Sequence, residues 1–314
     1  MSRPTMNDVA RQAGVSLKTV SRVVNGETTV DPALAARVRE AVASLGYRPN
    51  LGASLLRRAD QRTGTIGLLL PDLVSPFSAA LHRAIDAEVT RRGAQVLSGN
   101  VGHDPARERD LAETFARQHA DGLIITPVAA RQSHLAPDIP AVFVDRRARG
   151  WPADTVLATN HAGAKQAVEH LQRHGHRRIA YIGTMPGARR HGYRRAMAAA
   201  GLVKVERNDP EQALLEAPTA LFTESRTVTV AAIRALQAAG MQRRVALVGF
   251  DDFPLADLLD PGITVVAQDP VAMGRAAARA LFERIAGGTA EPRVISIPTT
   301  LIARGSGEVA IRGS

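Results

Sequence analysis

The sequence predicts a chain of two structural classes: a small all-α headpiece, followed by a larger two-lobed α/β core. Helix caps, glycine stops and apolar residues at helical spacing fill the first 50 residues. From residue 65 onward, short apolar runs alternate with helical stretches, which is typical of doubly wound parallel sheets. The alternation passes through two similar cycles, so we expect two lobes with a ligand-binding cleft between them.

The headpiece opens with a predicted helix-turn-helix. Thr5 can cap a first helix with Asp8 at capping-box spacing, and Gly14 ends that helix. After a tight turn, Ser16 can cap a second helix over 17–25. Two short helices joined by a glycine-containing turn form a pattern in which the second helix can enter a DNA major groove.

Two basic residues lie on the face of the second helix that does not pack on the first helix. Lys18 is in the first turn, where the helix dipole favours an acid instead. Arg22 follows one turn later and can offer a bidentate fork to guanine. A solvated charged face is the alternative interpretation. The caps, the turn and the elements that follow favour a face directed at DNA.

A third helix and a short hinge complete the N-terminal region. Asp31 precedes a proline at the first helical position, and Gly46 ends this helix, whose apolar stripe closes a three-helix core. Asn50 can cap a fourth helix over 51–57, which is too short to be stable alone in water. This segment can order on DNA and insert Leu56 into a minor groove as a wedge. The alternative is a linker helix that packs on the next domain.

Composition limits the function classes. The net charge is +10, and half of it lies in the first 62 residues, as phosphate binding requires. The chain has no cysteine, which excludes disulfides, a thiolate nucleophile and a cysteine-based zinc site. The start lacks the apolar run of a signal peptide, and no stretch approaches eighteen consecutive apolar residues. We therefore expect a cytoplasmic protein with no membrane partner.

The core is expected to contain ten strands and six helices. The strands are predicted at 66–70, 94–98, 123–126, 141–144, 155–158, 179–183, 220–223, 245–249, 264–267 and 294–297. The helices are predicted at 76–92, 105–119, 162–174, 187–200, 227–239 and 270–285. The predicted domains are therefore a headpiece over 1–48, a hinge and linker over 49–64 and the two-lobed core over 65–314.

Several segments resemble the DNA-binding headpiece of the lactose-repressor (LacI/GalR) family. They are Asp8-Val9-Ala10, Ala13-Gly14-Val15-Ser16, the run from Thr19 to Gly26, and the run from Leu45 to Asn50. The similarity continues through Thr65-Ile66-Gly67-Leu68, Asp121-Gly122-Leu123-Ile124, Gly175-His176-Arg177-Arg178-Ile179 and Val248-Gly249-Phe250-Asp251-Asp252. It therefore covers nearly the whole chain.

The resemblance implies a set of DNA contacts on a near-palindromic double-stranded operator. Leu17, Lys18 and Arg22 would read bases in the major groove. The residues that would mostly contact or position against the DNA backbone are Ser16, Thr19, Ser21, Asn25, Tyr47 and Asn50. Leu56 would be the wedge at the operator centre, and Thr5 and Ala53 complete the expected set. The hinge departs from the family pattern at Gly52 and Ser54.

The resemblance also implies a type I periplasmic-binding-protein fold whose chain crosses between lobes three times. We place these crossings near 145–159, near 249–265 and after 297. In such sheets a ligand binds at the carboxyl ends of the strands. The candidate effector residues at these ends are Asp72, Ser75, Phe77, Thr126, Asp145, Arg189, Tyr193, Ser225, Arg226, Asp251 and Gln268. For each of them, a helix cap or an interlobe salt bridge is the alternative interpretation.

Two departures from the family bear on the effector. The Asn-Asp pair that usually grips sugar hydroxyls is replaced by Ser225-Arg226, and the segments 134–140, 184–192 and 203–218 are short, as if a helix of the second lobe were trimmed. We therefore expect an effector other than a simple neutral hexose. It would be an acidic or phosphorylated metabolite attracted by Arg189 and Arg226, or there would be no classical effector.

Enzyme signatures are weak. His170 and His174 have the i, i+4 spacing of a metal site, but the acidic partners of a hydrolytic site are missing, so we expect surface or structural histidines. Residues 183–187 lack the P-loop lysine and the dinucleotide glycines. We expect no catalytic residue, metal or cofactor.

The sequence therefore predicts a homodimeric transcriptional repressor whose operator affinity is changed by a small molecule. The alternatives are a sugar-type binding protein, and a co-repressor or activator type of regulator with a non-sugar ligand. The C-terminal segment has no leucine heptad and gives no reason to expect a tetramer.

Overall fold

The computed structural model describes residues 4–24, 27, 29–47, 62–133, 135–136, 138–184 and 187–311. These residues belong to two compact units, Met1–Thr63 and Gly64–Ser314. The predicted DNA contacts Asn25, Asn50, Ala53 and Leu56 lie outside the described residues, as does the expected hinge helix.

The headpiece is a three-helix unit, as predicted, with α1 (Met6–Ala13), α2 (Leu17–Val24) and α3 (Pro32–Leu45). The Thr5 capping box is formed, and Gly14 ends α1 in the left-handed conformation that favours glycine. Each helix contributes one fully buried valine to a shared core: Val9, Val20 and Val38. The apolar spacing in the sequence thus builds a core that fixes α2 against α1 and α3.

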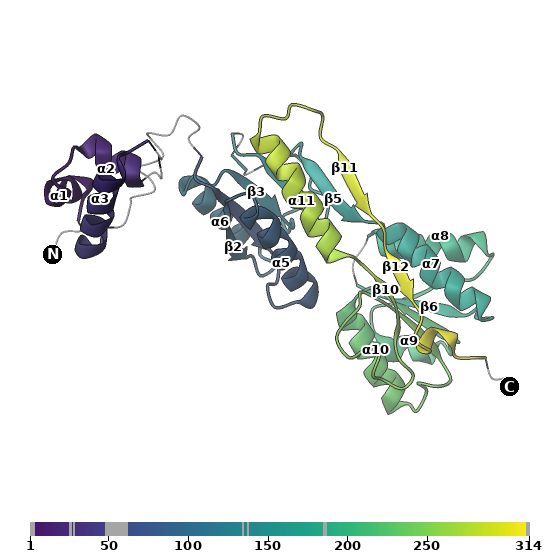
Figure 1. Ribbon diagram of the computed structural model, residues 1–314. Helices are drawn as coiled ribbons and strands as arrows, with labels where there is room; N and C mark the ends of the chain where they lie inside the picture. The colour runs from purple at the N-terminus through teal and green to yellow at the C-terminus, as the bar shows by residue number, and fades with distance from the viewer. Residues whose placement is uncertain are drawn as a thin grey trace. The chain divides into compact units, whose positions relative to one another are not determined.

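The first lobe of the core is a parallel sheet with helices on both faces (Figure 1). Its strand order is β11-β5-β4-β3-β1-β2. The strands are β1 (Thr65–Leu70), β2 (Gln95–Asn100), β3 (Gly122–Ile125), β4 (Ala141–Val144), β5 (Asp154–Ala158) and β11 (Val294–Ile297). Leu68 and Leu70 of β1 pack with α5 (Pro76–Thr90) and α11 (Pro270–Ile285), whereas Leu69 packs with α6 (Pro105–Arg117). Alternate side chains therefore serve the two faces.

The second lobe has a similar plan, with the strand order β12-β10-β9-β8-β6-β7, except that its edge strand β12 runs antiparallel to β10. The strands are β6 (Ile179–Ile182), β7 (Val205–Arg207), β8 (Ala220–Thr223), β9 (Ala246–Phe250), β10 (Thr264–Ala267) and β12 (Thr300–Ile302). The helices are α7 (Asn160–Arg173), α8 (Ala188–Ala199), α9 (Pro210–Leu215) and α10 (Arg226–Ala238). Sequence reasoning missed β7, α9 and β12, each only three to six residues long.

The chain passes between the lobes at 158–160, 267–270 and 297–300, which corrects one expected crossing. The crossing expected near 249–265 is wrong, because β9 and β10 pair in the same sheet, with Val265 opposite Gly249. The crossing expected near 145–159 occurs only at the end of that range, since β5 still pairs with β4. The third crossing is confirmed.

No helix among the described residues is long and apolar enough to cross a membrane.

Candidate DNA-binding face and interlobe cleft

The N-terminus of α2 presents a polar, exposed face. Ser16 accepts a hydrogen bond from the Thr19 backbone N–H at 3.1 Å, so Ser16 caps this helix as predicted. Leu17 is 41% exposed although it is apolar, and Lys18 is exposed beside it. The first turn of α2 contains no acid. The helix dipole and Lys18 therefore both favour an anion at this end.

Arg22 has a partner that sequence reasoning missed. Its Nε donates to the Glu27 carboxylate at 2.8 Å. This contact leaves the two terminal nitrogens of Arg22 as a fork, which is the group that reads guanine. Glu27 thus orients the arginine. The signal was present in the sequence as an acid one turn beyond Arg22, in the segment that follows α2.

The other described DNA-contact candidates have structural partners as well. Thr5 caps α1 by accepting from the Asp8 N–H at 3.4 Å, and its hydroxyl donates to the Asp8 carboxylate at 2.7 Å. Ser21 is partly buried on α2. Tyr47 is only 8% exposed and packs in the headpiece core, so it presents little surface to DNA.

A cleft of about 650 Å³ lies between the two lobes of the core. All but one of the predicted effector residues line it: Asp72, Ser75, Phe77, Thr126, Asp145, Arg189, Ser225, Arg226, Asp251 and Gln268. They converge because the carboxyl ends of parallel strands meet at one edge of each sheet. Ser75 and Ser225 also cap α5 and α10, so the cap interpretation is correct for these two residues.

Tyr193 does not line the cleft, which corrects that prediction. It is fully buried in the second lobe, where its hydroxyl donates to the Ile179 carbonyl at 2.8 Å and accepts from the Val205 N–H at 3.0 Å. Burial raises the pKa of Tyr193 to about 12. Arg189 and Tyr193, four residues apart, lie on the same face of α8. Arg189 is in the first turn, at the cleft, whereas Tyr193 lies one turn further along the helix and packs in the core.

Arg189 and Asp251 form the central contact of the cleft. The Arg189 guanidinium donates to both oxygens of the Asp251 carboxylate, at 3.1 and 3.3 Å. It also donates to the Asn160 side chain at 3.0 Å and to the Glu224 carbonyl at 2.6 Å, and it lies 3.9 Å from the centre of the Phe250 ring. Arg189 is therefore largely neutralised, and the expected attraction of an acidic effector falls to Arg226.

Asp145 occupies the equivalent place in the first lobe. Asp145 follows β4 with φ 70°, and Asp251 follows β9 with φ 69°. Each donates its backbone N–H to the next strand of its sheet, to Val156 and Val266 respectively, at 2.9 Å. Burial raises the pKa of the Asp145 carboxyl, and the nearby Arg189 and Arg146 oppose that rise. The two aspartates thus mark a structural repeat that the sequence does not show.

Glu224 is a cleft residue that sequence reasoning missed. It is 8% exposed, and its carboxylate accepts from the Tyr181 hydroxyl at 3.0 Å and from the Thr184 N–H at 2.7 Å. Burial, with the nearby Glu224 charge, raises the pKa of the Tyr181 phenol. Glu224 therefore fills one wall of the cleft in the second lobe. Its position directly before Ser225-Arg226 was the available signal.

Three polar atoms of cleft-lining residues are buried without a hydrogen-bond partner among the described residues. They are the Thr126 hydroxyl, the Gln268 side-chain oxygen and the Arg190 Nε. The Gln268 amide nitrogen, by contrast, donates to Asp251 at 2.7 Å. Since buried polar atoms are normally paired, these atoms favour a polar ligand in the cleft.

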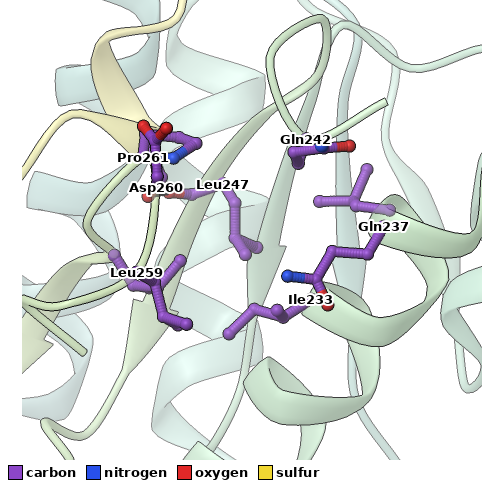
Figure 2. Close-up of a pocket in the computed structure, with 10 residues that line it drawn as sticks. Ile233, Gln237, Gln242, Leu247, Leu259, Asp260 and Pro261 are labelled. Carbon is purple, nitrogen blue, oxygen red and sulfur yellow. Dashed lines mark hydrogen bonds between the residues drawn. The ribbon is translucent and has the colours of Figure 1, made fainter. Parts of the chain in front are cut away.

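A second, apolar cavity lies on the far side of the second lobe (Figure 2). Ile233, Leu247 and Leu259 point into it, with Gln237 and Gln242 at its edge. Its volume is about 20 Å³, which is room for one water molecule and far too little for a metabolite. The interlobe cleft is therefore the better candidate for the effector site.

Histidines on α7 and just after it have a structural role. His170 is buried against the Glu308 carboxylate, and Glu308 also accepts from the Thr264 hydroxyl at 2.9 Å. His176 is fully buried and donates to the Val309 carbonyl at 2.9 Å. Both side chains thus hold the C-terminal segment against α7. Among the described residues, no group of three or more His, Asp or Glu is arranged to hold a metal.

Comparison with known proteins gives the family. The family model described as bacterial regulatory proteins, lacI family, matches residues 5–50, and that of a periplasmic binding protein-like domain matches residues 168–307. The HTH-type transcriptional regulator PtxS of Pseudomonas plecoglossicida is 33% identical, over 97% of this chain and 96% of that protein. The chain belongs to the LacI family of bacterial regulatory proteins. It is a DNA-binding transcriptional regulator.

Other LacI-family proteins agree over the full length. The ribose operon repressor of Escherichia coli K12 is 30% identical, over 96% of this chain and 99% of that protein. The structure of the lac repressor dimer bound to operator and the anti-inducer ONPF has a TM-score of 0.84 at 25% identity, covering 98% of this chain and 100% of that chain. The two-lobed core predicted from the sequence is therefore confirmed.

We predict that His176 makes the stability of the core fall on acidification. Burial lowers the pKa of the His176 imidazole below its ordinary value of 6.5. The unfolded chain then binds more protons than the folded one, so stability is full above about pH 6.5 and is lost as the pH falls toward the folded pKa. Urea midpoints at pH 7 and pH 5.5 measure this loss.

His176→Gln keeps a donor for Val309 but does not titrate, so its midpoint should change less between the two pH values. Exposed His191→Gln is the control and should behave as the wild type. An unchanged pH dependence in His176→Gln would contradict the assignment.

Proposed function

We propose that the protein is a dimeric repressor whose operator affinity is changed by a small, hydroxyl-rich effector that carries one acidic group. The observation that carries the DNA-binding part is the exposed, acid-free N-terminus of α2, where Lys18 and Arg22 stand on the face opposite the headpiece core. In this proposal the protein has no catalytic role and acts in the cytoplasm, where the DNA is.

The headpiece supports a recognition mode in which α2 enters the major groove. Leu17 can contact a thymine methyl group, Lys18 can donate to acceptor atoms on base edges, and Arg22 can pair with guanine. Two copies related by a two-fold axis would read two half-sites of a near-palindromic operator. Insertion of Leu56 between the half-sites remains part of this proposal.

Exposed leucines support the dimer. Leu255 and Leu258 follow β9 in the second lobe and are 64% and 74% exposed. Exposed apolar side chains that form a contiguous patch are typical of an interface, and these two leucines lie three residues apart in one loop. The lac repressor, which shares the fold over the whole chain, is a dimer on its operator in the structure named above.

The cleft supports a polyhydroxylated effector. Asp145, Asp251 and Gln268 offer acceptors, the unpaired Thr126 hydroxyl can donate or accept, and Phe77 offers an apolar face. The related regulator CelR, whose structure has a TM-score of 0.69 at 32% identity and covers 97% of this chain and 100% of that chain, is in a complex with cellobiose. A sugar-type ligand is therefore the class we propose.

Arg226 supports an acidic group on that ligand. It is the first residue of α10 and lines the cleft, and its guanidinium has no hydrogen bond or ion pair to any described residue. The positive end of the α10 dipole adds to its charge. Because Arg189 is neutralised by Asp251, Arg226 is the cleft cation best placed to take a carboxylate or phosphate.

Coupling follows from the position of the cleft. A ligand that contacts both lobes favours one interlobe arrangement, and DNA binding by the paired headpieces favours one arrangement as well. Each ligand then changes the affinity of the other by the same factor. Relief of repression results if the two arrangements differ, and co-repression results if they coincide. A binding protein without a regulatory role would not need the headpiece.

We predict that Arg22→Ala relaxes the base preference at one position in each half-site. Duplexes bound by the full chain should be selected from a random pool at a fixed salt concentration and sequenced. The wild type should return a near-palindromic consensus. Loss of the guanine fork should cost about 1–3 kcal/mol at that position only.

Arg39→Ala is the matched control, since Arg39 is an exposed headpiece arginine on α3. It removes the same charge and should leave the consensus unchanged. If Arg22→Ala weakened all sequences equally, Arg22 would be a phosphate contact, and the base-reading role would be incorrect.

We predict that Arg226→Gln removes the preference for acidic ligands. Neutral monosaccharides and the corresponding sugar acids should be titrated into the full chain, with binding followed by calorimetry. A sugar acid should bind the wild type at least about tenfold more tightly than its neutral counterpart, because a hydrogen bond to a charged group contributes about 1.5–3 kcal/mol.

The preference should disappear in Arg226→Gln and persist in Arg195→Gln, which removes an exposed arginine from α8. Tight binding of a neutral monosaccharide with no gain for its acid would contradict the proposal.

A further inference from the structure

A basic groove of about 470 Å³ lies between α5 and α11 on the first lobe, outside the effector cleft. The two helices lie side by side (Figure 1). Alanines of α5 form the floor of the groove. Arg83 and Arg91 of α5 line it on one side, and Arg275 and Arg279 of α11 line it on the other.

Close packing of the two helices explains the alanine floor. A Cβ added at Gly274 of α11 would lie 2.8 Å from the Leu81 carbonyl oxygen and 2.9 Å from the Ala84 Cβ. Only a glycine permits this approach. The helices therefore leave a narrow, shallow channel between them, and the long arginine side chains form its walls.

The charge along the channel is unbalanced. Arg91, Arg92 and Arg279 share one carboxylate, that of Glu88, whose side chain is 2% exposed. Arg83 and Arg275 make no hydrogen bond or ion pair with any described residue. Asp86, also on α5, is not among the residues that line the groove. Four arginines therefore line the groove, and the Glu88 carboxylate, which two of them contact, is buried.

Other exposed arginines of the core are paired in some cases and unpaired in others. Arg207 pairs with Glu216, Arg243 with Asp260 and Arg293 with Glu283, whereas Arg195 and Arg234 make no hydrogen bond or ion pair with any described residue. What distinguishes the groove is that four arginines line one channel. Like charges one helical turn apart, such as Arg275 and Arg279, repel each other, and an anionic partner in the groove would relieve that repulsion.

We propose that the groove is a docking surface for an acidic helix of another protein. Arg83 and Arg91 stand two turns apart on α5, and Arg275 and Arg279 stand one turn apart on α11. A third helix with glutamates at i, i+4 spacing has the same repeat, and its ridge fits a channel between two helices. Each arginine offers a planar fork that matches a carboxylate.

The position of the groove gives such a partner access to the regulatory core. α11 begins at Pro270, directly after the second interlobe crossing. Gln268, in that crossing, donates to Asp251 in the effector cleft. The exposed Val271 and Arg275 line the groove near this end of α11. A partner docked here would therefore act on the interlobe crossing as a second input beside the effector.

The test uses a synthetic alanine-based helical peptide with a glutamate at every fourth position, labelled with a fluorophore. Its binding to the full-length protein is followed by anisotropy at low salt. The wild type should bind the glutamate peptide, and the same peptide with glutamine at those positions should not bind. The double variant Arg83→Glu/Arg275→Glu should lose at least about tenfold in affinity, since like charges across an interface are repelled.

Arg195→Glu/Arg234→Glu is the matched control, because it changes the net charge equally on exposed positions of α8 and α10. It should bind the glutamate peptide as the wild type does, and both double variants keep the same headpiece. Equal losses in the two double variants, or equal binding of the two peptides, would overturn the proposal. Displacement of the peptide by millimolar inorganic phosphate would also overturn it, in favour of a small-anion site.

Discussion

The ion pair between Arg189 and Asp251 is the contact on which the cleft depends. It joins the start of α8 to the end of β9, and the same guanidinium holds Asn160 at the start of α7 and the Glu224 carbonyl at the end of β8. Gln268 reaches the same carboxylate from the interlobe crossing. Five loop segments of one sheet edge are thus fixed by one charged contact that is only about one-fifth exposed.

That contact also decides the electrostatics of the site. With Arg189 satisfied, the floor of the cleft offers oriented hydrogen-bonding groups instead of a free charge. In the proposed mode of binding, specificity for charge rests on Arg226, which stands at the N-terminus of α10. Selectivity of this kind depends on buried polar atoms that a wrong ligand would leave unpaired, and Thr126 is placed to impose that cost.

The sheet edge and the crossings are mechanically linked. Two of the three crossings contact each other, because the Thr299 N–H donates to the Thr159 hydroxyl at 3.0 Å and the two threonine hydroxyls lie 3.2 Å apart. The third crossing carries Gln268, which belongs to the cleft. A ligand that draws the lobes together therefore acts on the strands that connect them, and α11 carries the effect into the first lobe.

The sequence predicted the repeating elements well and the connections less well. Apolar runs such as 141–144 and 220–223 were placed at their observed limits, because burial on both faces of a parallel strand makes the run continuous. The crossing near 249–265 was misplaced, since a loop that returns to the same sheet has no local signal that distinguishes it from one that leaves.

In the candidate site, too, part of the arrangement could be predicted and part could not. The positions at the carboxyl ends of the strands could be predicted as cleft residues, because the sheet topology brings these positions together whatever their side chains are. Tyr193 was misassigned because it shares a face of α8 with Arg189 but lies one turn further from the cleft, where that face packs in the core. Glu224 and Glu27 were missed because their importance comes from partners, Tyr181 and Arg22, that only the folded chain reveals.

The most direct test of the account is the reciprocity of effector and operator binding in the full-length protein. The affinity for the selected operator duplex should be measured with and without saturating effector, and the effector affinity with and without saturating operator. The account predicts that both change by the same factor, on the order of 5–150-fold. Operator affinity that stays constant at saturating effector would contradict coupling between the cleft and the headpiece.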